Sequence, residues 1–134
     1  MIGTEHYLID TNILIYFFDG LLTENQKNEV IELLKNSFTI SVITKIEFLG
    51  FKDYFDELKY KKAKEFVDLA EVLPLSDHLI DRIIKIKQHK NLKLGDAIIA
   101  ATAIENNLTI VTRNEKDFKK IENLKLINPF TNDK

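Results

Sequence analysis

Short apolar runs alternate along this chain with longer segments in which apolar residues recur at helical spacing. The apolar runs predict buried strands at 7–9, 38–43, 72–75, 108–112 and 125–127. Helical spacing predicts helices at 13–18, 23–34, 45–49, 76–86 and 96–106. Strands that alternate with helices are typical of an α/β domain with a mainly parallel sheet. The pattern therefore predicts an α/β/α sandwich, in which helices cover both faces of one central, mainly parallel sheet.

The helix predicted to begin at Asp96 is rich in small side chains, and it leads almost directly into the strand at 108–112. Its small residues are Ala97, Ala100, Ala101, Thr102 and Ala103. Small side chains let a helix lie close to a sheet, and a helix that feeds a strand with almost no loop is half of a right-handed βαβ unit. We therefore expect this segment to organise the domain.

Three further segments complete the pattern. Residues 53–70 place apolar side chains among many charges, which predicts an amphipathic helical hairpin over the body of the domain. Pro74 indicates that the strand at 72–75 lies at an edge of the sheet or ends there. Residues 131–134 are expected to fray.

Length and composition are those of one ordinary globular domain. The 134 residues suffice for one core, so the sequence predicts a single domain over 1–134. The hydrophobic fraction is 45%, and no apolar run approaches the roughly 18 residues that a membrane span requires. The lack of cysteine excludes disulfides and thiolate zinc sites, and the polar first residues do not resemble a signal peptide. We therefore expect a cytoplasmic protein that has no membrane partner.

Acidic and polar side chains follow three of the predicted strands. They are Asp10 after the first strand, Thr44 and Glu47 after the second, and Thr112, Asn114 and Asp117 after the strand at 108–112. Ligands of parallel α/β sheets bind outside the carboxyl ends of the strands, so these side chains are expected to face one site. Asp96 precedes its strand, and it joins the others only if its helix starts near the same edge.

Each of these residues also has a purely structural interpretation as part of a helix cap. The candidates are Asp10 or Asn12 at the first helix, Thr44 with Glu47 as a capping box, Asp96 as an acid favoured by its helix dipole, and Asn114 with Asp117 as a cap followed by a first-turn acid. Without their expected convergence, four separate caps would explain the same residues.

Convergence favours a metal site over four separate caps. Carboxylates gathered within a few ångströms raise one another's pKa unless a cation neutralises them. Mg²⁺ and Mn²⁺ prefer carboxylate oxygens and keep several waters. Such an ion can activate a bound water and stabilise the charge that builds on a phosphodiester. The pattern therefore indicates metal-assisted phosphodiester hydrolysis.

Four motifs stand in order along the chain. They are Leu-Ile-Asp-Thr-Asn at 8–12, Thr-Lys-Ile-Glu at 44–47, the helix start at 94–103 and the strand and turn at 110–118. Together they resemble the PIN domain, and the length and ordering resemble in particular the VapC-type ribonuclease toxins of prokaryotic toxin–antitoxin pairs. Each motif alone is weak, but the four cover nearly the whole chain at fairly specific spacings.

The resemblance implies an α/β/α sandwich with an acidic pocket for one or two Mg²⁺ or Mn²⁺ ions, and endonucleolytic cleavage of RNA. It also implies a homodimer and inhibition by a small cognate antitoxin. By position, Asp10, Glu47 and Asp96 match the family's three principal acids, which are the expected metal ligands. The accessory polar positions are matched by Thr11 or Asn12, Thr112 and Asn114.

One position departs from the family pattern. Many members carry a fourth acid where this chain has Asn114. Asp117, three residues further on, is a candidate for the fourth catalytic acid; the alternative is that a second metal binds weakly. Thr44 is a further accessory polar candidate, because it lies in the same motif as Glu47.

Lysines gather in two runs although the net charge is only −2. The runs are Lys59, Lys61, Lys62 and Lys64, and Lys85, Lys87, Lys90 and Lys93. Such clusters can neutralise phosphates, although most lysine runs are solvated helix faces. The second run ends just before Asp96, so Lys93 is a candidate contact for a substrate phosphate. Arg113 is another, because a guanidinium matches phosphate geometry.

The leading hypothesis is a metal-dependent endoribonuclease that acts as a toxin. An alternative from another class is a non-catalytic PIN-like module for RNA binding or assembly, which Asn114 in a usual acid position motivates. A third is a phospho-receiver-like domain, but that fold expects paired acids after the first strand, and Asp10 is followed by Thr11 and Asn12.

Overall fold

The computed structural model describes residues 6–51 and 56–130. In chain order its elements are β1 (Tyr7–Ile9), α1 (Thr11–Phe18), α2 (Glu24–Asn36), β2 (Thr39–Ser41), α3 (Val42–Leu49), α4 (Glu57–Val67), β3 (Glu71–Leu73), α5 (Asp77–His89), α6 (Leu94–Asn106), β4 (Thr109–Val111), α7 (Glu115–Phe118) and β5 (Lys125–Ile127). Strands and helices alternate along most of the chain, as the hydrophobic pattern predicted.

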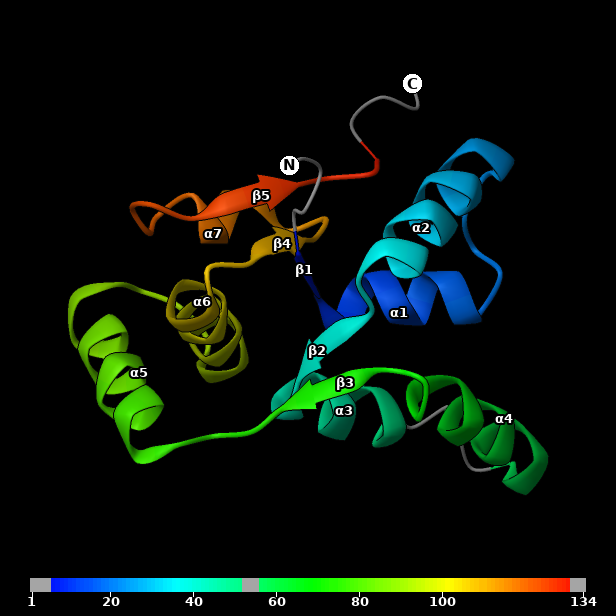
Figure 1. Ribbon diagram of the computed structural model, residues 1–134, viewed down its shortest axis with the longest axis horizontal. Helices are drawn as coiled ribbons and strands as arrows, with labels where there is room; N and C mark the ends of the chain where they lie inside the picture. The colour runs from blue at the N-terminus through cyan, green and yellow to red at the C-terminus, as the bar shows by residue number, and fades with distance from the viewer. Residues whose placement is uncertain (1–5, 52–55, 131–134) are drawn as a thin grey trace.

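Hydrogen bonds join the strands at the centre of the molecule into a three-stranded parallel sheet of β1, β4 and β5 and a two-stranded parallel sheet of β2 and β3 (Figure 1). β4 pairs with β1 on one side and with β5 on the other, so that Ile110 lies between Leu8 and Leu126. β2 pairs in parallel with β3, and β2 also lies beside β1. The predicted central, mainly parallel sheet is therefore confirmed.

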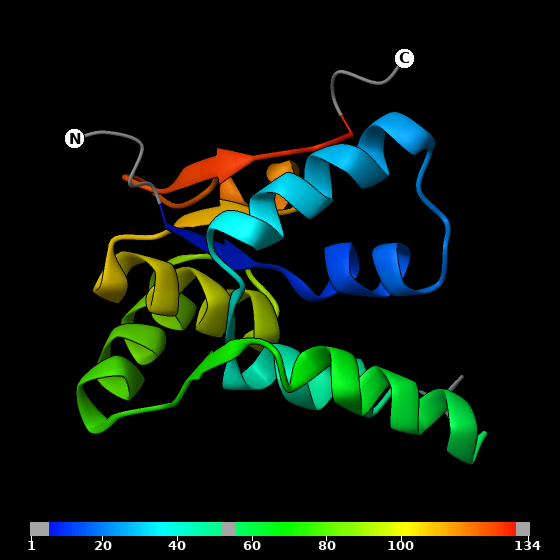
Figure 2. The ribbon, with the colours of Figure 1, turned by 45° about the vertical axis from the view of Figure 1, so that its right-hand side comes forward.

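Alternate residues of the strands build the two sides of the core, because successive side chains of a strand point to opposite faces. Ile9 and Val111 belong to one apolar cluster, which includes residues of α1, α2 and α4. Leu8 and Ile110 belong to another, which includes Ile99 of α6. Figure 2 shows α1 and α2 on one side of the strands and α5 and α6 on the other. This is the predicted α/β/α sandwich.

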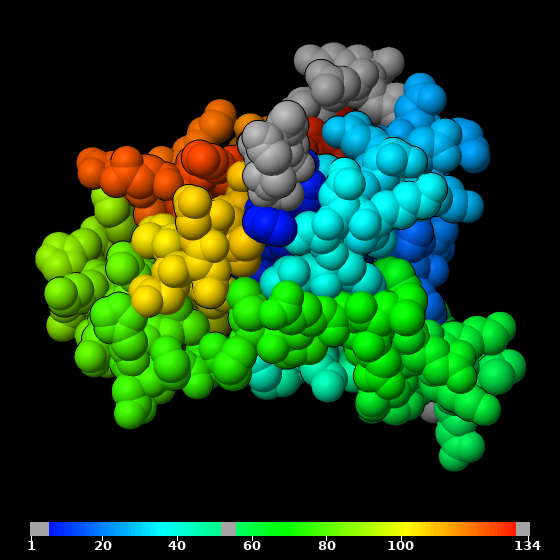
Figure 3. Space-filling model, in the orientation of Figure 1, coloured from blue at the N-terminus to red at the C-terminus, as the bar shows by residue number. Residues whose placement is uncertain are grey.

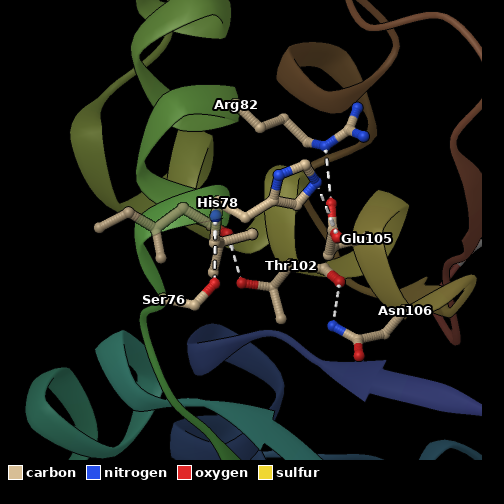
Figure 4. A network of polar contacts seen from close by, with 8 residues as sticks. Ser76, His78, Arg82, Thr102, Glu105 and Asn106 are labelled. Carbon is tan, nitrogen blue, oxygen red and sulfur yellow. Dashed lines mark hydrogen bonds and ion pairs between the residues drawn. The ribbon is translucent and has the colours of Figure 1, made fainter.

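Small side chains let α6 pack on two partners at once. Ala100 and Ala103 are fully buried against the sheet, while Ala97 and Ala101 pack with apolar residues of α5. Outside this contact, Glu105 accepts from Arg82 Nε at 3.2 Å and lies 3.1 Å from His78 Nε2 (Figure 4). The predicted close packing of this helix is confirmed.

Phe66 of α4 holds that helix against the first half of the chain. Its ring centroid lies 5.3 to 6.0 Å from those of Phe17, Phe18, Phe38 and Phe48. The described part of the predicted hairpin at 53–70 is the single helix α4, which Asp56 caps. Residues 53–55 of that predicted hairpin lie outside the described residues. In the space-filling view the surface of α2 borders that of the β3 and α4 segment (Figure 3).

The boundary between β2 and α3 differs from the prediction. The strand expected at 38–43 ends at Ser41, because the Ser41 hydroxyl accepts from the Ile43 amide and caps α3. The predicted capping box of Thr44 and Glu47 is therefore wrong, since both residues lie inside the helix. β-branched residues favoured the longer strand, but the local serine cap ended it.

Two smaller expectations concern the chain's edges. β3 ends at Leu73, so Pro74 directly follows the strand. This agrees with the prediction that Pro74 marks either an edge strand or the end of the strand. Residues 131–134 lie outside the described residues. Within 6–51 and 56–130, no helix is long and apolar enough to cross a membrane.

Enlarging Ala100 tests the close packing of α6. We expect Ala100→Leu to lower the free energy of unfolding by about 1–3 kcal/mol, because its site is fully buried and extra methylenes force neighbours off their rotamers. Urea denaturation followed by circular dichroism measures this change. Ile104→Leu on the same helix keeps the side-chain volume and should cost less than about 1.5 kcal/mol; equal losses in both variants would contradict the packing argument.

Candidate active site

An open cleft of about 790 Å³ lies at the carboxyl ends of β1 and β4. Its lining comprises Asp10, Thr11, Asn12, Ile15, Glu47, Gly50, Phe51, Lys93, Asp96, Asn114 and Asp117. The four acids that the sequence singled out therefore face one space. They come from α1, α3, α6 and α7 and their caps, so the cleft exists only in the folded chain.

Asp10 is the most buried of these acids, with 4% of its surface exposed. Its amide donates to the Val111 carbonyl at 2.9 Å, which places it beside the end of β4. Its carboxylate accepts from the Thr11 amide at 2.8 Å, the Thr112 hydroxyl at 2.6 Å and the Asn12 side-chain amide at 3.2 Å. Asp10 is therefore both the cap of α1 and a member of the cleft.

Burial raises the pKa of the Asp10 carboxyl from 3.8 to about 6. The Thr112 hydrogen bond opposes this rise, while the negative charges of Asp96 and Glu47 add to it. Among the residues of 6–51 and 56–130, no Lys, Arg or His forms an ion pair with this buried carboxylate. Such a carboxylate favours a positively charged ligand.

Glu47 is fixed by the threonine next to Asp10. The Thr11 hydroxyl donates to Glu47 Oε1 at 2.6 Å and lies 3.2 Å from the hydroxyl of Thr44, which is fully buried. Thr44 thus contacts the Thr11 hydroxyl from the buried side, and Thr44 itself does not line the cleft. Thr11 thereby links the two acids, because its backbone amide donates to Asp10 and its hydroxyl donates to Glu47.

Gly95 lets α6 begin beside Glu47. A Cβ at this position would lie 2.8 Å from Glu47 Oε2, so a larger residue would require the Glu47 carboxylate to move from its present place. Gly95 thus leaves the Glu47 carboxylate where it lies beside the start of α6. The start of α6 lies at the edge where the other acids lie, so Asp96 joins them although it precedes its strand in the chain.

Asn114 joins the last two acids. Its side-chain amide donates to Asp96 Oδ2 at 3.3 Å and to Asp117 Oδ2 at 3.2 Å, and its Oδ1 accepts from the Asp117 amide and caps α7. Its own backbone amide donates to the Thr112 hydroxyl at 2.8 Å, which in turn donates to Asp10. One polar network therefore runs from Asp10 to Asp117.

Opposite pKa shifts distinguish the two acids that Asn114 joins. Burial raises the pKa of Asp96, and the charges of Asp117 and Glu47 add to the rise, while Lys93 opposes it. The Asn114 amide and then Lys120, whose Nζ lies 3.3 Å from the carboxylate, lower the pKa of Asp117. Of Asp96 and Asp117, Asp117 is therefore the acid that more readily stays ionised.

The donor set suits a hard divalent cation bound with much of its water. Four carboxylates line the cleft, and no cysteine is available to compete for a softer metal. Among the described residues no three Asp, Glu or His side chains are grouped closely enough to enclose an ion. Mg²⁺ needs only one or two carboxylates because it keeps several waters, so the residues fit it.

The remaining sequence candidates divide into three groups. Thr11, Asn12, Asn114 and Lys93 line the cleft, and the buried Thr44 and Thr112 hold its members from behind. Arg113 instead turns to Tyr16, whose hydroxyl accepts from Nη1 at 2.6 Å. Sequence reasoning did not find the roles of Gly95 and Lys120; a glycine directly before an acid in a first helical turn was the available signal for Gly95.

Comparisons with known proteins give a consistent family. The PIN domain model matches residues 7–124, a span that contains every residue of the cleft. Ribonuclease VapC2 of Rickettsia felis is 30% identical over an alignment of 131 positions, which covers 91% of this chain and 96% of that protein. A toxin–antitoxin complex from Klebsiella pneumoniae contains a chain that is 31% identical, with a TM-score of 0.74 and coverage of 92% of this chain and 97% of its own. VapBC2 from Rickettsia felis, bound to a DNA fragment from its promoter, contains a chain that is 27% identical, with a TM-score of 0.75 and coverage of 92% and 98%.

The buried carboxylate of Asp10 should make metal-free stability depend on pH. Its folded pKa exceeds its unfolded value, so its contribution is fully present below pH 3.8 and is lost as pH rises through about 6. In EDTA, the unfolding free energy of Asp10→Asn minus that of the unchanged protein should therefore increase by about 2 kcal/mol between pH 4 and pH 7. Urea titrations at each pH measure this difference.

Asp117→Asn is the matched comparison, since the folded pKa of Asp117 is lowered. Its contribution is present above the unfolded pKa and is lost as pH falls, so this variant should lose stability relative to the unchanged protein as pH rises. A difference for Asp10→Asn that stays flat with pH would contradict the assignment of Asp10 as a buried, uncompensated carboxylate.

Proposed function

Because the chain belongs to the PIN domain family, we propose that it is a Mg²⁺- or Mn²⁺-dependent endoribonuclease that hydrolyses RNA phosphodiester bonds as the toxin of a toxin–antitoxin pair. The observation that carries this proposal is the convergence of Asp10, Glu47, Asp96 and Asp117 on one cleft at the carboxyl ends of the strands. The name of the ribonuclease VapC2 relative supports the choice of RNA as the substrate.

Asp10, Glu47 and Asp96 are the residues that would hold the ion, either directly or through its coordinated waters. When bound there, a divalent cation lowers the pKa of a coordinated water and stabilises negative charge on a phosphodiester. The chain's own contribution is to hold these carboxylates ready: the Thr112 and Thr11 hydroxyls orient Asp10 and Glu47, and the Asn114 amide orients Asp96.

Asp117 completes the acidic cleft as a fixed negative charge. The Asn114 amide and Lys120 lower its pKa, and a carboxylate with a lowered pKa is a weak proton acceptor. We therefore assign it to electrostatic positioning of the ion and its waters, with Asn114 as the residue that sets its distance from Asp96.

Lys93 is the proposed phosphate contact on the α6 side of the cleft. Its loop is held from two sides, because Lys87 Nζ donates to the Leu92 carbonyl at 2.6 Å and Lys120 Nζ to the Asn91 carbonyl at 3.0 Å. In the other lysine run, Lys64 pairs with Asp68, which favours a solvated helix face there.

We also propose a small antitoxin as protein partner and a homodimer as the assembly. Solved structures with chains like this one are a toxin–antitoxin complex and VapBC2 bound to promoter DNA, which supports the first. The outer face of α5 leaves Ile80 41% and Ile84 48% exposed one turn apart, and such an apolar face supports the second.

Replacing Asp96 tests the proposed nuclease. We expect Asp96→Asn to keep the fold and to lose RNA cleavage, because it removes a carboxylate of the metal site without changing its size. The assay is cleavage of a panel of tRNA, rRNA and mRNA by the purified protein in EDTA, Mg²⁺ or Mn²⁺. Asp81→Asn makes the same substitution on the exposed surface of α5 and should cut like the unchanged protein.

Metal-dependent cutting that disappears only in Asp96→Asn would support the proposal. A fully active Asp96→Asn protein, or cutting that persists in EDTA, would refute it. RNA binding without cleavage by the unchanged protein in either metal would instead favour the non-catalytic RNA-binding alternative.

A second substitution isolates the bridging amide of Asn114. We expect Asn114→Ser to lower Mg²⁺ affinity or cleavage about 10- to 100-fold, as losses of groups that orient metal ligands do. Serine keeps an oxygen that can cap α7 but cannot bridge Asp96 and Asp117. Asn25→Ser, on the exposed start of α2, is the control; an unchanged Mg²⁺ dependence in Asn114→Ser would show that the bridge is dispensable.

A further inference from the structure

Beyond the acids, the side chain of Arg113 is held in a corner between two aromatic rings. Its guanidinium carbon lies 4.8 Å from the centroid of the Tyr16 ring and 4.7 Å from that of Phe130. The two rings meet edge to face, with centroids 5.9 Å apart and an interplanar angle of 86°. Nη1 also donates to the Tyr16 hydroxyl at 2.6 Å. The guanidinium is therefore oriented before any ligand arrives.

The aromatic corner is itself anchored to the fold. Tyr16 belongs to α1, whose first residue follows Asp10. The Phe130 amide donates to Asn128 Oδ1 at 2.9 Å, and the Asn128 side-chain amide donates to Glu115 of α7 at 2.8 Å. Both walls of the corner are thus tied to helices that begin at the cleft.

Arg113 keeps capacity for an anion. Throughout 6–51 and 56–130, no Asp or Glu lies within ion-pair distance of its guanidinium. The bond to Tyr16 occupies one N–H, and a guanidinium carries several more. Arg113 is exposed, whereas its two aromatic neighbours are half-buried. A charged, oriented and accessible fork without a carboxylate partner suits a phosphate.

Hydrogen bonds connect the backbone of Arg113 to the acids of the cleft. The Arg113 amide lies 3.5 Å from Asn12 Oδ1, Asn12 donates to Asp10, and the network continues through Thr112 and Asn114 to Asp96. Lys93 lines the cleft beyond Asp96, three residues before it in the chain. Hydrogen bonds therefore connect the Arg113 backbone to the acids, and the Arg113 side chain lies beside Tyr16 of α1, while Lys93 lies at the start of α6.

We propose that Tyr16, Arg113 and Phe130 form a phosphate subsite that binds the RNA backbone on the α1 side of the acidic cleft, with Lys93 on the α6 side. This inference rests on the proposed nuclease function and adds the path of its substrate: the strand crosses the acids with a cation holding it on either side. The acids repel phosphates, so flanking cations are needed to hold an RNA strand across them. Arg113 binds; it takes no part in the proton or metal chemistry.

Salt dependence of RNA binding tests the subsite. The measurement is fluorescence anisotropy of a short, labelled single-stranded RNA of mixed sequence with full-length Asp96→Asn protein, across a series of KCl concentrations. Arg113→Gln in this background should weaken binding roughly tenfold. It should also lower the slope of log affinity against log salt by about 0.7, the value for one lost phosphate contact on a single strand. A residue with only a structural role would leave that slope unchanged.

Three further variants separate charge from orientation and from folding. Tyr16→Phe removes the hydroxyl that orients Nη1, and should weaken binding about two- to threefold with the slope unchanged. Arg113→Lys keeps the charge and should keep the slope while losing affinity. Lys35→Gln removes an exposed cation at the end of α2, just before β2, and should change neither quantity. If Arg113→Gln fails to fold by circular dichroism, Tyr16→Phe and Arg113→Lys decide.

The outcomes distinguish this proposal from the proposed function. RNA binding by Asp96→Asn that Arg113→Gln leaves unchanged in affinity and slope would overturn the subsite alone and leave the nuclease standing. No RNA binding at any salt, together with no cleavage by the unchanged protein, would remove both. The same titration is repeated with labelled polyglutamate in place of RNA. If Arg113→Gln weakens binding of polyglutamate more than binding of RNA, the subsite is overturned in favour of a carboxylate-bearing protein partner.

Discussion

The burial of one carboxylate, that of Asp10, is the constraint on which the site depends. It lies at the end of β1, where β4, α1 and the loop after β4 meet, and each of these supplies a donor or acceptor to it. Burial raises its pKa to about 6, and the nearby acids add to the rise. The fold therefore holds an unfavourable negative charge at its centre, and a divalent cation is the ligand that would relieve it.

The rest of the architecture brings the other acids to Asp10 without crowding. Gly95 removes the one Cβ that would meet the Glu47 carboxylate, and the alanines behind it let α6 lie against the sheet. Two residues then set the spacing between the carboxylates: Thr11, whose amide binds Asp10 and whose hydroxyl binds Glu47, and Asn114, whose side-chain amide binds Asp96 and Asp117. Packing and polar contacts thus act together, since neither group of residues would position the acids alone.

Caps and site residues turn out to be the same residues in several places, which explains why the sequence left both interpretations open. Asp10 caps α1 and Asn114 caps α7, and both also belong to the cleft. The exception is Thr44 with Glu47, where capping-box spacing was misleading because Ser41 already caps α3. Local spacing cannot separate these cases, since a cap and a ligand use the same oxygen atoms in the same first helical turn.

The sequence by itself determined the order of elements, the parallel sheet, the small-residue helix and the four acids, because hydrophobic period and residue size act locally and leave a direct trace in the chain. Only the tertiary structure decided that α6 begins at the acidic edge, that Gly95 admits Glu47, and that Arg113 turns away from the acids to lie between Tyr16 and Phe130. These relations join residues from 17 to 97 positions apart, and such contacts depend on how whole elements pack, which no local pattern encodes.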